Sequence, residues 1–375
     1  MTALTALAFL AAPVQADEPP LSLHNDFIRA DDLPTAPPTF GEEPWNVVDL
    51  TDLSVVRMPR SVPADAFSTT DFRAAIAAAV AHRSTEYDIV IVTHSDELVP
   101  DFGNAAAFQM AFNNADVWGT GDDPVITPDM PVRSALWMNH VDYWDSWGAD
   151  LADWVFCHEV GHQWLAFPST IPDPHSSSGE TDDELALLGR QRAHWSFFLD
   201  TANSPMEGNA WVDNGDGTYT THLTSGMVFN PLDLYMMGLR EAAAVPDFLL
   251  LEPTGPTDLF RERSPQHRYD DEGPVTLEAS PRTVTIDDLI AANGPWQSGD
   301  YTAAHIQALH VVLLMPHEPL SFHVLDRARE KRSEWLDAWA FCTGEESVLE
   351  LGVVDEGWTV PDIPTRPALI PGGAW

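Results

Sequence analysis

Three residues near the middle of the chain have the types and the spacing that bind a metal ion. The string HEVGH covers residues 158–162, with a histidine at each end and a glutamate in second place. On an α-helix, positions four apart differ by only about 40° in direction, so His158 and His162 would project from one face, one turn apart. Two imidazole nitrogens at that separation can bind one zinc ion, at about 2.0–2.1 Å each. Glu159 lies about 100° around the helix from His158, which predicts a general base for a water molecule at the metal rather than a third ligand.

Chance rarely produces this pattern. The chain has 14 histidines in 375 residues, which gives about 0.03 expected matches. The pattern also lies within a predicted amphipathic helix over residues 150–167, whose apolar side chains would face the core. Gly161 costs about 1 kcal/mol of helix propensity, and close packing beside a metal would explain its presence. We therefore favour a zinc site over an ordinary pair of core histidines.

A third ligand must come from the sequence that follows. The downstream candidates are His175, Glu180, Glu184, His194, Glu207, His222 and Asp233. His194 is favoured because Trp195 and two phenylalanines flank it, and an imidazole buried among apolar rings needs a partner that zinc would provide. Glu180 or Glu184, and then Glu207, are the alternatives. His194 could also be a core histidine that bonds a backbone carbonyl.

The HEVGH string resembles the active-site motif of the zincin metallopeptidases. The resemblance implies that His158 and His162 bind zinc and that Glu159 is the catalytic base. Zincins place a helix and several strands before the active-site helix. The chain has a similar order of predicted elements, namely a helix over 69–82 and strands over 88–93, 108–118 and 134–140. The resemblance covers residues 65–245.

The chain departs from both named zincin groups. Metzincins continue as H-x-x-G-x-x-H, but Leu165 stands at the glycine position and Pro168 at the position of the third histidine. Gluzincin aminopeptidases have a similar HEVGHQW string and a glutamate nineteen residues after the second histidine, where this chain has Thr181. The chain is therefore identified as a divergent secreted bacterial zincin.

Residues 231–238 (PLDLYMMG) compare with the methionine-containing turn beneath the zinc of metzincins. The comparison implies that Met236 or Met237 forms the floor of the site. Tyr235 is then a candidate catalytic residue that donates a hydrogen bond to the developing oxyanion. The favoured alternative is an ordinary helix start that packs apolar residues. The remaining histidines have no ligand-like spacing and are interpreted as core or surface residues: His94, His140, His267, His305, His310, His317 and His323.

These elements predict an α+β fold. A zincin-like catalytic lobe, made of a small mixed sheet and the active-site helix, would precede a mainly helical C-terminal subdomain. The helical part depends on predicted helices over 287–292, 301–314 and 321–341, after a strand at 284–286. The expected divisions are a signal peptide at 1–16, a proline- and acid-rich leader or linker at 17–65, a catalytic domain at 66–245, a helical subdomain at 246–345 and an irregular tail at 346–375. Whether 17–65 is a propeptide stays open.

The charge balance excludes whole classes of partner. The chain has 18 Lys and Arg against 58 Asp and Glu, a formal net charge of −40. Phosphate backbones and anionic lipid head groups would repel it, which excludes nucleic acid as a partner. No apolar run reaches the ~18 residues that span a bilayer, so we expect no membrane insertion. The expected partner is a protein or peptide substrate, and the expected state is a monomer.

The N-terminal residues predict export. An apolar stretch over 3–12 is followed by small residues that fit cleavage after Ala16, although no Lys or Arg precedes the stretch. The alternative is a disordered apolar N-terminus. An exported protein would be secreted, extracellular or periplasmic. Its only two cysteines, Cys157 and Cys342, would then form one disulfide that closes a long loop, or else be two small buried thiols.

Residues 212–218 (VDNGDGT) predict a tight hairpin turn, because Asn-Gly and Asp-Gly accept positive φ angles. A calcium loop is less favoured, because the acidic residues do not alternate at ligand positions and no glutamate closes the loop.

Together these features predict a secreted zinc-dependent endopeptidase. Protein substrates are favoured because an edge strand can pair with an extended peptide backbone. A zinc aminopeptidase and a non-catalytic surface or binding protein on a zincin-like scaffold are the alternatives. The presence of Glu159 argues against the last, because a structural zinc site needs four protein ligands and no base.

Overall fold

The structure is a computed structural model. It describes residues 44–50, 52–62, 67–81, 87–95, 98, 102, 105–120, 124–165, 168, 186–222, 228–265, 273–297 and 299–352. Several predictions made above concern residues outside this described part: the signal peptide at 1–16, the ligand candidates His175, Glu180 and Glu184, His267, and most of the tail at 346–375.

A seven-stranded sheet forms the larger unit. Its strands are β1 (Asn46–Asp49), β2 (Ser54–Arg57), β3 (Ile89–His94), β4 (Phe108–Ala111), β5 (Ser134–His140), β11 (His305–Leu314) and β12 (Val348–Leu351). The order is β1-β2-β11-β3-β5-β4, and β12 pairs with β11 beyond the end of β2. Strands β2, β11, β3 and β5 are parallel, whereas β1 and β4 run antiparallel at the two edges.

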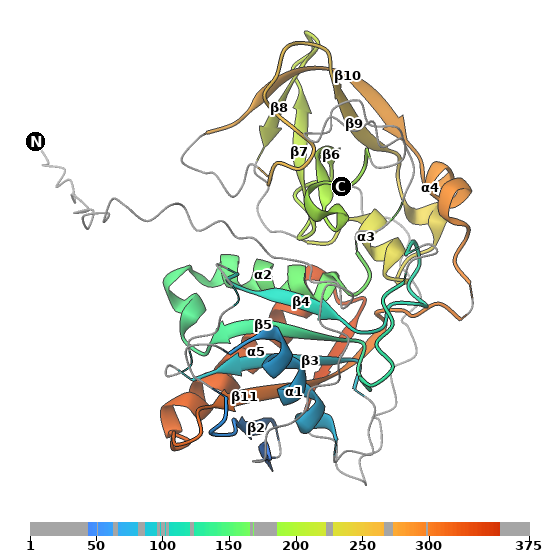
Figure 1. Ribbon diagram of the computed structural model, residues 1–375. Helices are drawn as coiled ribbons and strands as arrows, with labels where there is room; N and C mark the ends of the chain where they lie inside the picture. The colour runs from blue at the N-terminus through green and yellow to red at the C-terminus, as the bar shows by residue number, and fades with distance from the viewer. Residues whose placement is uncertain are drawn as a thin grey trace, which may run out of the picture.

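Helices cover both faces of this sheet (Figure 1). They are α1 (Thr69–Val80), α2 (Ala149–Gly161) and α5 (Phe322–Cys342). Val90 and Val92 of β3 belong to the apolar cluster that contains α1, while Ile89 and Ile91 belong to the cluster that contains α2 and α5. The continuous apolar run of β3 is therefore buried on both faces, as expected for a central parallel strand.

A closed barrel of five strands forms the second unit. The strands are β6 (Trp195–Asp200), β7 (Glu207–Asp213), β8 (Thr218–His222), β9 (Phe248–Pro253) and β10 (Thr276–Val284), in the order β10-β8-β7-β6-β9. Figure 1 shows the barrel above α2, which separates it from the sheet. One apolar cluster contains residues of the sheet, of α2 and of the barrel, so α2 is the shared layer between the two units.

Shorter helical elements connect these strands. They are η3 (Tyr143–Ser146), η4 (Arg190–Arg192), α3 (Pro231–Met236), η5 (Ala242–Ala244) and α4 (Ile286–Asn293). Between β7 and β8 the chain turns at Gly215 and Gly217, which have φ angles of 79° and 88°. The pairing of Asp213 with Tyr219 confirms the hairpin that the Asn-Gly and Asp-Gly dipeptides predicted.

The predicted fold class is wrong. The protein is mostly β, with a seven-stranded sheet and a five-stranded barrel, and not a zincin-like lobe followed by a mainly helical subdomain. The segment predicted as a helix at 301–314 contains β11, which lies at the centre of the sheet between β3 and β2. Seven of the ten residues of β11 are apolar. Such a composition fits a buried strand as well as a buried helix, so the neighbouring strands decide its conformation. Strand β9 was not predicted. Strand β10 ends at Val284, where the predicted strand at 284–286 was expected to begin, and Ile286 already belongs to α4.

Other elements are close to their predicted ranges. Helix α1, strands β3 and β5, and helix α5 lie within a few residues of the expected bounds. Strand β4 stops at Ala111 and is shorter than the predicted 108–118. Helix α2 ends at Gly161, six residues before the expected end, so His162 is its C-cap residue. Within the described residues, no helix combines the length and the apolar character needed to cross a membrane.

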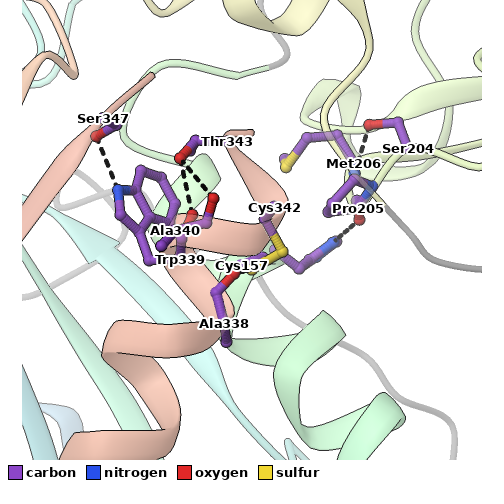
Figure 2. The surroundings of a disulfide bond; sticks show 11 residues. Cys157, Ser204, Pro205, Met206, Ala338, Trp339, Ala340, Cys342, Thr343 and Ser347 are labelled. Carbon is purple, nitrogen blue, oxygen red and sulfur yellow. Dashed lines mark hydrogen bonds between the residues drawn. A yellow bond between two sulfur atoms is a disulfide. The ribbon is translucent and has the colours of Figure 1, made fainter. Parts of the chain in front are cut away.

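Cys157 and Cys342 form a disulfide, which confirms the cross-link over two free thiols. The bond joins α2 to the last residue of α5 across 185 positions of sequence (Figure 2). Because Cys157 directly precedes His158, the disulfide fixes α2 at the turn that carries the metal-site motif.

Candidate metal centre

Three buried histidines meet where α2 ends and the barrel begins. The Nε2 atom of His158 lies 3.1 Å from Nε2 of His162 and 3.1 Å from Nε2 of His194. The exposed fractions of the three residues are 0%, 2% and 0%. One ligand atom from each lies within 4.8 Å of the other two. The structure thus brings together the two helix histidines and His194, the candidate that the sequence favoured as third ligand.

Two elements position these rings. His158 lies in the last turn of α2, and His162 follows as the C-cap residue, with its N–H bonded to the His158 carbonyl at 3.1 Å. His194 comes from the segment between η4 and β6, at the edge of the barrel. The site therefore depends on the contact between α2 and the barrel.

Gly161 allows this contact to be close. A Cβ atom at this position would lie 2.7 Å from Sδ of Met206 and 3.2 Å from the ring of Phe229. Such separations are too short for ordinary packing, so a side chain here would displace the Met206 thioether and the Phe229 ring. The close packing that we predicted at Gly161 is present.

The second nitrogen of each ring faces a backbone carbonyl. Nδ1 of His158 lies 2.6 Å from the Pro205 oxygen, Nδ1 of His162 lies 3.3 Å from the Leu165 oxygen, and Nδ1 of His194 lies 3.0 Å from the Arg190 oxygen. A carbonyl only accepts, so each Nδ1 donates. In a neutral ring Nε2 then keeps a lone pair, and Nε2 of His158 lies beside Nε2 of the other two rings. Backbone carbonyls that fix the tautomer in this way are a recurrent feature of histidine metal ligands.

Three lone pairs at such short range repel one another unless a cation lies between them. Burial, followed by the positive charge of Arg190, lowers the pKa of His194 well below its ordinary value, so this ring is neutral. Neutral imidazoles are the form that binds metals. Two nitrogens that bind one zinc ion tetrahedrally are about 3.4 Å apart, close to the 3.1 Å found here. The cluster could therefore hold a metal ion, and its donor set fits one.

Glu159 follows His158 on the same helix and is fully buried. A carboxylate is costly to bury without compensation, and a nearby metal ion would compensate it. Its assignment as the general base stays a prediction.

The other described ligand candidates have different partners. Glu207 accepts hydrogen bonds from Nη2 and Nε of Arg190 at 2.6 and 2.8 Å. Asp233 accepts from Trp195 Nε1 and Ser204 Oγ, both at 2.7 Å. His222 is exposed at the end of β8. None of these three belongs to the histidine group, as far as the described residues show.

Tyr235 is buried in α3, where its ring packs edge-on against Trp118 at 5.3 Å. Burial raises the pKa of its hydroxyl, and a hydrogen bond with the backbone of Trp296 opposes this. These contacts do not include the histidines, so its role as an oxyanion donor stays a prediction. Met236 and Met237 are fully buried, but the methionine that contacts α2 at Gly161 is Met206.

Two of the remaining histidines belong to the core of the sheet, in agreement with their interpretation. His94 ends β3 and His310 lies within β11, and both are buried. Burial lowers the pKa of His94 to about 4 and that of His310 to about 3.

The sequence did not predict the residues that hold the His158 and His194 rings in place, directly or through a neighbour. These are Arg190, Ser204, Pro205, Met206 and Asp233, of which Asp233 was expected only as a possible ligand. The string Asn230-Pro-Leu-Asp233 is a readable helix start, and the capping box is present. Nothing in the string shows that the Asp233 side chain also bonds Trp195 and Ser204, because those residues lie 38 and 29 positions earlier.

No family model matches this chain, and comparisons with curated proteins and with solved structures found no significant match. The function must therefore be inferred from the site alone.

Proposed function

We propose that this protein is a zinc-dependent peptidase that hydrolyses peptide bonds with water. The observation that carries the proposal is the convergence of three buried imidazoles, two of them from a helix that also presents Glu159. Imidazole nitrogens are donors that suit zinc. Among the described residues the group has three members, as in catalytic zinc sites, whereas structural sites have four protein ligands.

A bound zinc ion would supply Lewis acidity, which polarises a carbonyl group and acidifies water in the fourth position. The chain's own groups would do the rest. His158, His162 and His194 would hold the ion, each oriented by its Nδ1–carbonyl bond. Glu159 would take the proton of the attacking water and return it to the leaving nitrogen.

An endopeptidase is the form of this activity that we favour. Strand β4 is the sheet edge on the side of α2, although it offers only four residues for pairing with a substrate strand. The disulfide supports export, since such bonds persist in oxidising compartments. We therefore keep a secreted or periplasmic location within the proposal.

The decisive experiment compares the wild type with Glu159→Gln. Casein hydrolysis and zinc content are measured on both proteins, with Glu278→Gln on the exposed face of β10 as the matched control. We expect Glu159→Gln to keep its zinc and to lose at least 100-fold in rate, which is the usual contribution of a general base, and the control to match the wild type. Unchanged hydrolysis in Glu159→Gln would reject the mechanism.

The same assay separates the alternatives. Equal cleavage of free and N-acetylated peptides identifies an endopeptidase, whereas an aminopeptidase requires the free amine. Stoichiometric zinc without turnover on any peptide would identify a non-catalytic metal-binding protein and overturn the proposal.

A further inference from the structure

We propose that Asp233 is a positioning residue that sets two of the three metal ligands at once. This inference rests on the metal centre of the proposed function, but it does not depend on the reaction. Asp233 lies in α3, away from the histidine group, and is fully buried. Its two carboxylate oxygens bond two different segments, and each segment supports one ligand.

The first segment carries His194. Oδ1 of Asp233 accepts a hydrogen bond from Nε1 of Trp195 at 2.7 Å. Trp195 is the residue directly after His194 and is itself fully buried. Since the indole is fixed at its polar end, the start of β6 cannot rotate or slide without breaking a charge-assisted hydrogen bond, which is stronger than a neutral one.

The second segment supports His158. Oδ2 of Asp233 accepts a hydrogen bond from Oγ of Ser204 at 2.7 Å. The same Oγ accepts the Met206 N–H at 3.0 Å, so it closes a tight turn around Pro205. The Pro205 carbonyl, 2.6 Å from Nδ1 of His158, is thus held at the position that orients this ring. Figure 2 shows Ser204, Pro205 and Met206 together near the disulfide.

The carboxylate is itself anchored by the start of α3. The Asn230 N–H donates to Oδ2 at 2.8 Å, and Oδ1 of Asn230 accepts the Asp233 N–H at 3.0 Å. Asp233 thus receives three donors, from Trp195, Ser204 and Asn230. An asparagine of the same size has one acceptor oxygen and would place an NH₂ group against at least one of these donors.

The test is the metal affinity of the full chain, measured on metal-free protein. The dissociation constant for Zn²⁺ is obtained by competition with a chromophoric chelator, and the visible absorption of added Co²⁺ reports the ligand geometry. We expect Asp233→Asn to weaken Zn²⁺ binding by about 10-fold or more, as outer-shell changes do, and to alter the Co²⁺ spectrum. An unchanged affinity and spectrum would overturn the proposal.

Three further variants separate positioning from folding. Ser204→Ala removes one bond to Asp233 with little loss of volume. Trp195→Phe removes the other bond, but it also leaves a cavity where the larger indole was buried. We expect each variant to weaken Zn²⁺ binding several-fold. Thr285→Ala is the stability control, because it removes the side-chain cap of a different helix, α4. It should lower the thermal stability of the metal-free chain and leave the affinity unchanged. A Thr285→Ala variant that loses as much affinity as Asp233→Asn would show that lost stability alone is responsible and would overturn the proposal.

If Asp233→Asn does not fold, the Trp195 and Ser204 variants decide, because unchanged affinity in both overturns the proposal. Loss of casein hydrolysis has no part in this test. A wild type that binds Zn²⁺ but hydrolyses nothing would reject the peptidase and leave the role of Asp233 intact. A wild type that binds neither Zn²⁺ nor Co²⁺ would overturn both.

Discussion

Arg190 and Glu207 form an ion pair, and the backbone carbonyl of Arg190 contacts His194. Nη2 of Arg190 lies 2.6 Å from Oε1 of Glu207, and the two side chains are only 11% and 1% exposed. The backbone carbonyl of Arg190 lies 3.0 Å from Nδ1 of His194. The pair therefore joins β7 to the carbonyl that orients the third ligand.

Breaking this pair from one side leaves the buried carboxylate of Glu207 without the guanidinium that faces it. We expect Arg190→Met to lower the free energy of unfolding of the metal-free chain by about 3 kcal/mol. The measurement is urea unfolding at neutral pH. The double variant Arg190→Met/Glu207→Met removes both charges and should recover most of that loss. A double variant as unstable as the single one would contradict this account.

We predict that reduction of the Cys157–Cys342 disulfide lowers the stability of the fold strongly. In the chain-entropy model, a cross-link over 185 positions stabilises the fold by up to about 5 kcal/mol. We expect thermal unfolding at a markedly lower temperature after reduction, and the same shift in the Cys157→Ala/Cys342→Ala variant without reductant. If reductant lowers the unfolding temperature of that variant further, then reduction acts somewhere other than this bond.

Metal binding should stabilise the wild type and not a variant without the third ligand. At a Zn²⁺ concentration about 1,000 times the dissociation constant, the expected stabilisation is about 4 kcal/mol, and a chelator should reverse it. His194→Ala should show no stabilisation at the same concentration. His310→Ala is the matched control, since His310 is also fully buried but bonds Thr93 and lies in β11. It should be destabilised without metal and still respond to Zn²⁺ like the wild type.

The sequence predicted the histidine group that could hold a metal ion better than it predicted the fold. His158 and His162 have a fixed spacing on one helix, so local geometry alone brings them together. The apolar rings beside His194 indicated burial, and a buried imidazole needs a partner. The hydrogen bonds that orient these rings could not be predicted, because they join segments far apart in the sequence. The Pro205 carbonyl bonds His158, and the Asp233 carboxylate bonds Trp195 next to His194.

The prediction of the fold was wrong where the local sequence pattern does not determine the conformation. Residues 305–314 are mostly apolar, and this composition suits either a buried helix or a buried strand. The outcome depends on pairing with β3 and β2, whose paired residues come about 220 and 260 positions earlier. The hairpin of β7 and β8 was predictable because two glycines at a tight turn carry a local signal. The closure of the barrel by β9 and β10 has no such signal.

Asp153 on α2 predicts a pH dependence of stability. Burial, and next the negative charge of Glu334 on α5, raise its pKa from 3.8 to about 6, with smaller contributions from Asp150 and Asp337 and an opposing one from Lys331. A carboxyl whose pKa is raised in the fold contributes stability that is fully present below about pH 4 and is lost as the pH rises through about 6. The ionised side chain is therefore unfavourable at neutral pH.

Replacing this carboxyl with an amide removes the unfavourable charge. We expect Asp153→Asn to be more stable than the wild type at pH 8, by about 0.5 kcal/mol because solvent screens a half-buried site, and the difference to vanish near pH 4. Added salt should shrink it, since salt screens the repulsion from Glu334. Urea unfolding at the two pH values is the measurement.

Asp216 in the β7–β8 turn is a control of opposite sign, because hydrogen bonds from Thr218 lower its pKa. Asp216→Asn should give no increase in stability at pH 8, and an increase equal to that of Asp153→Asn would mean that lowering the net charge alone accounts for the effect.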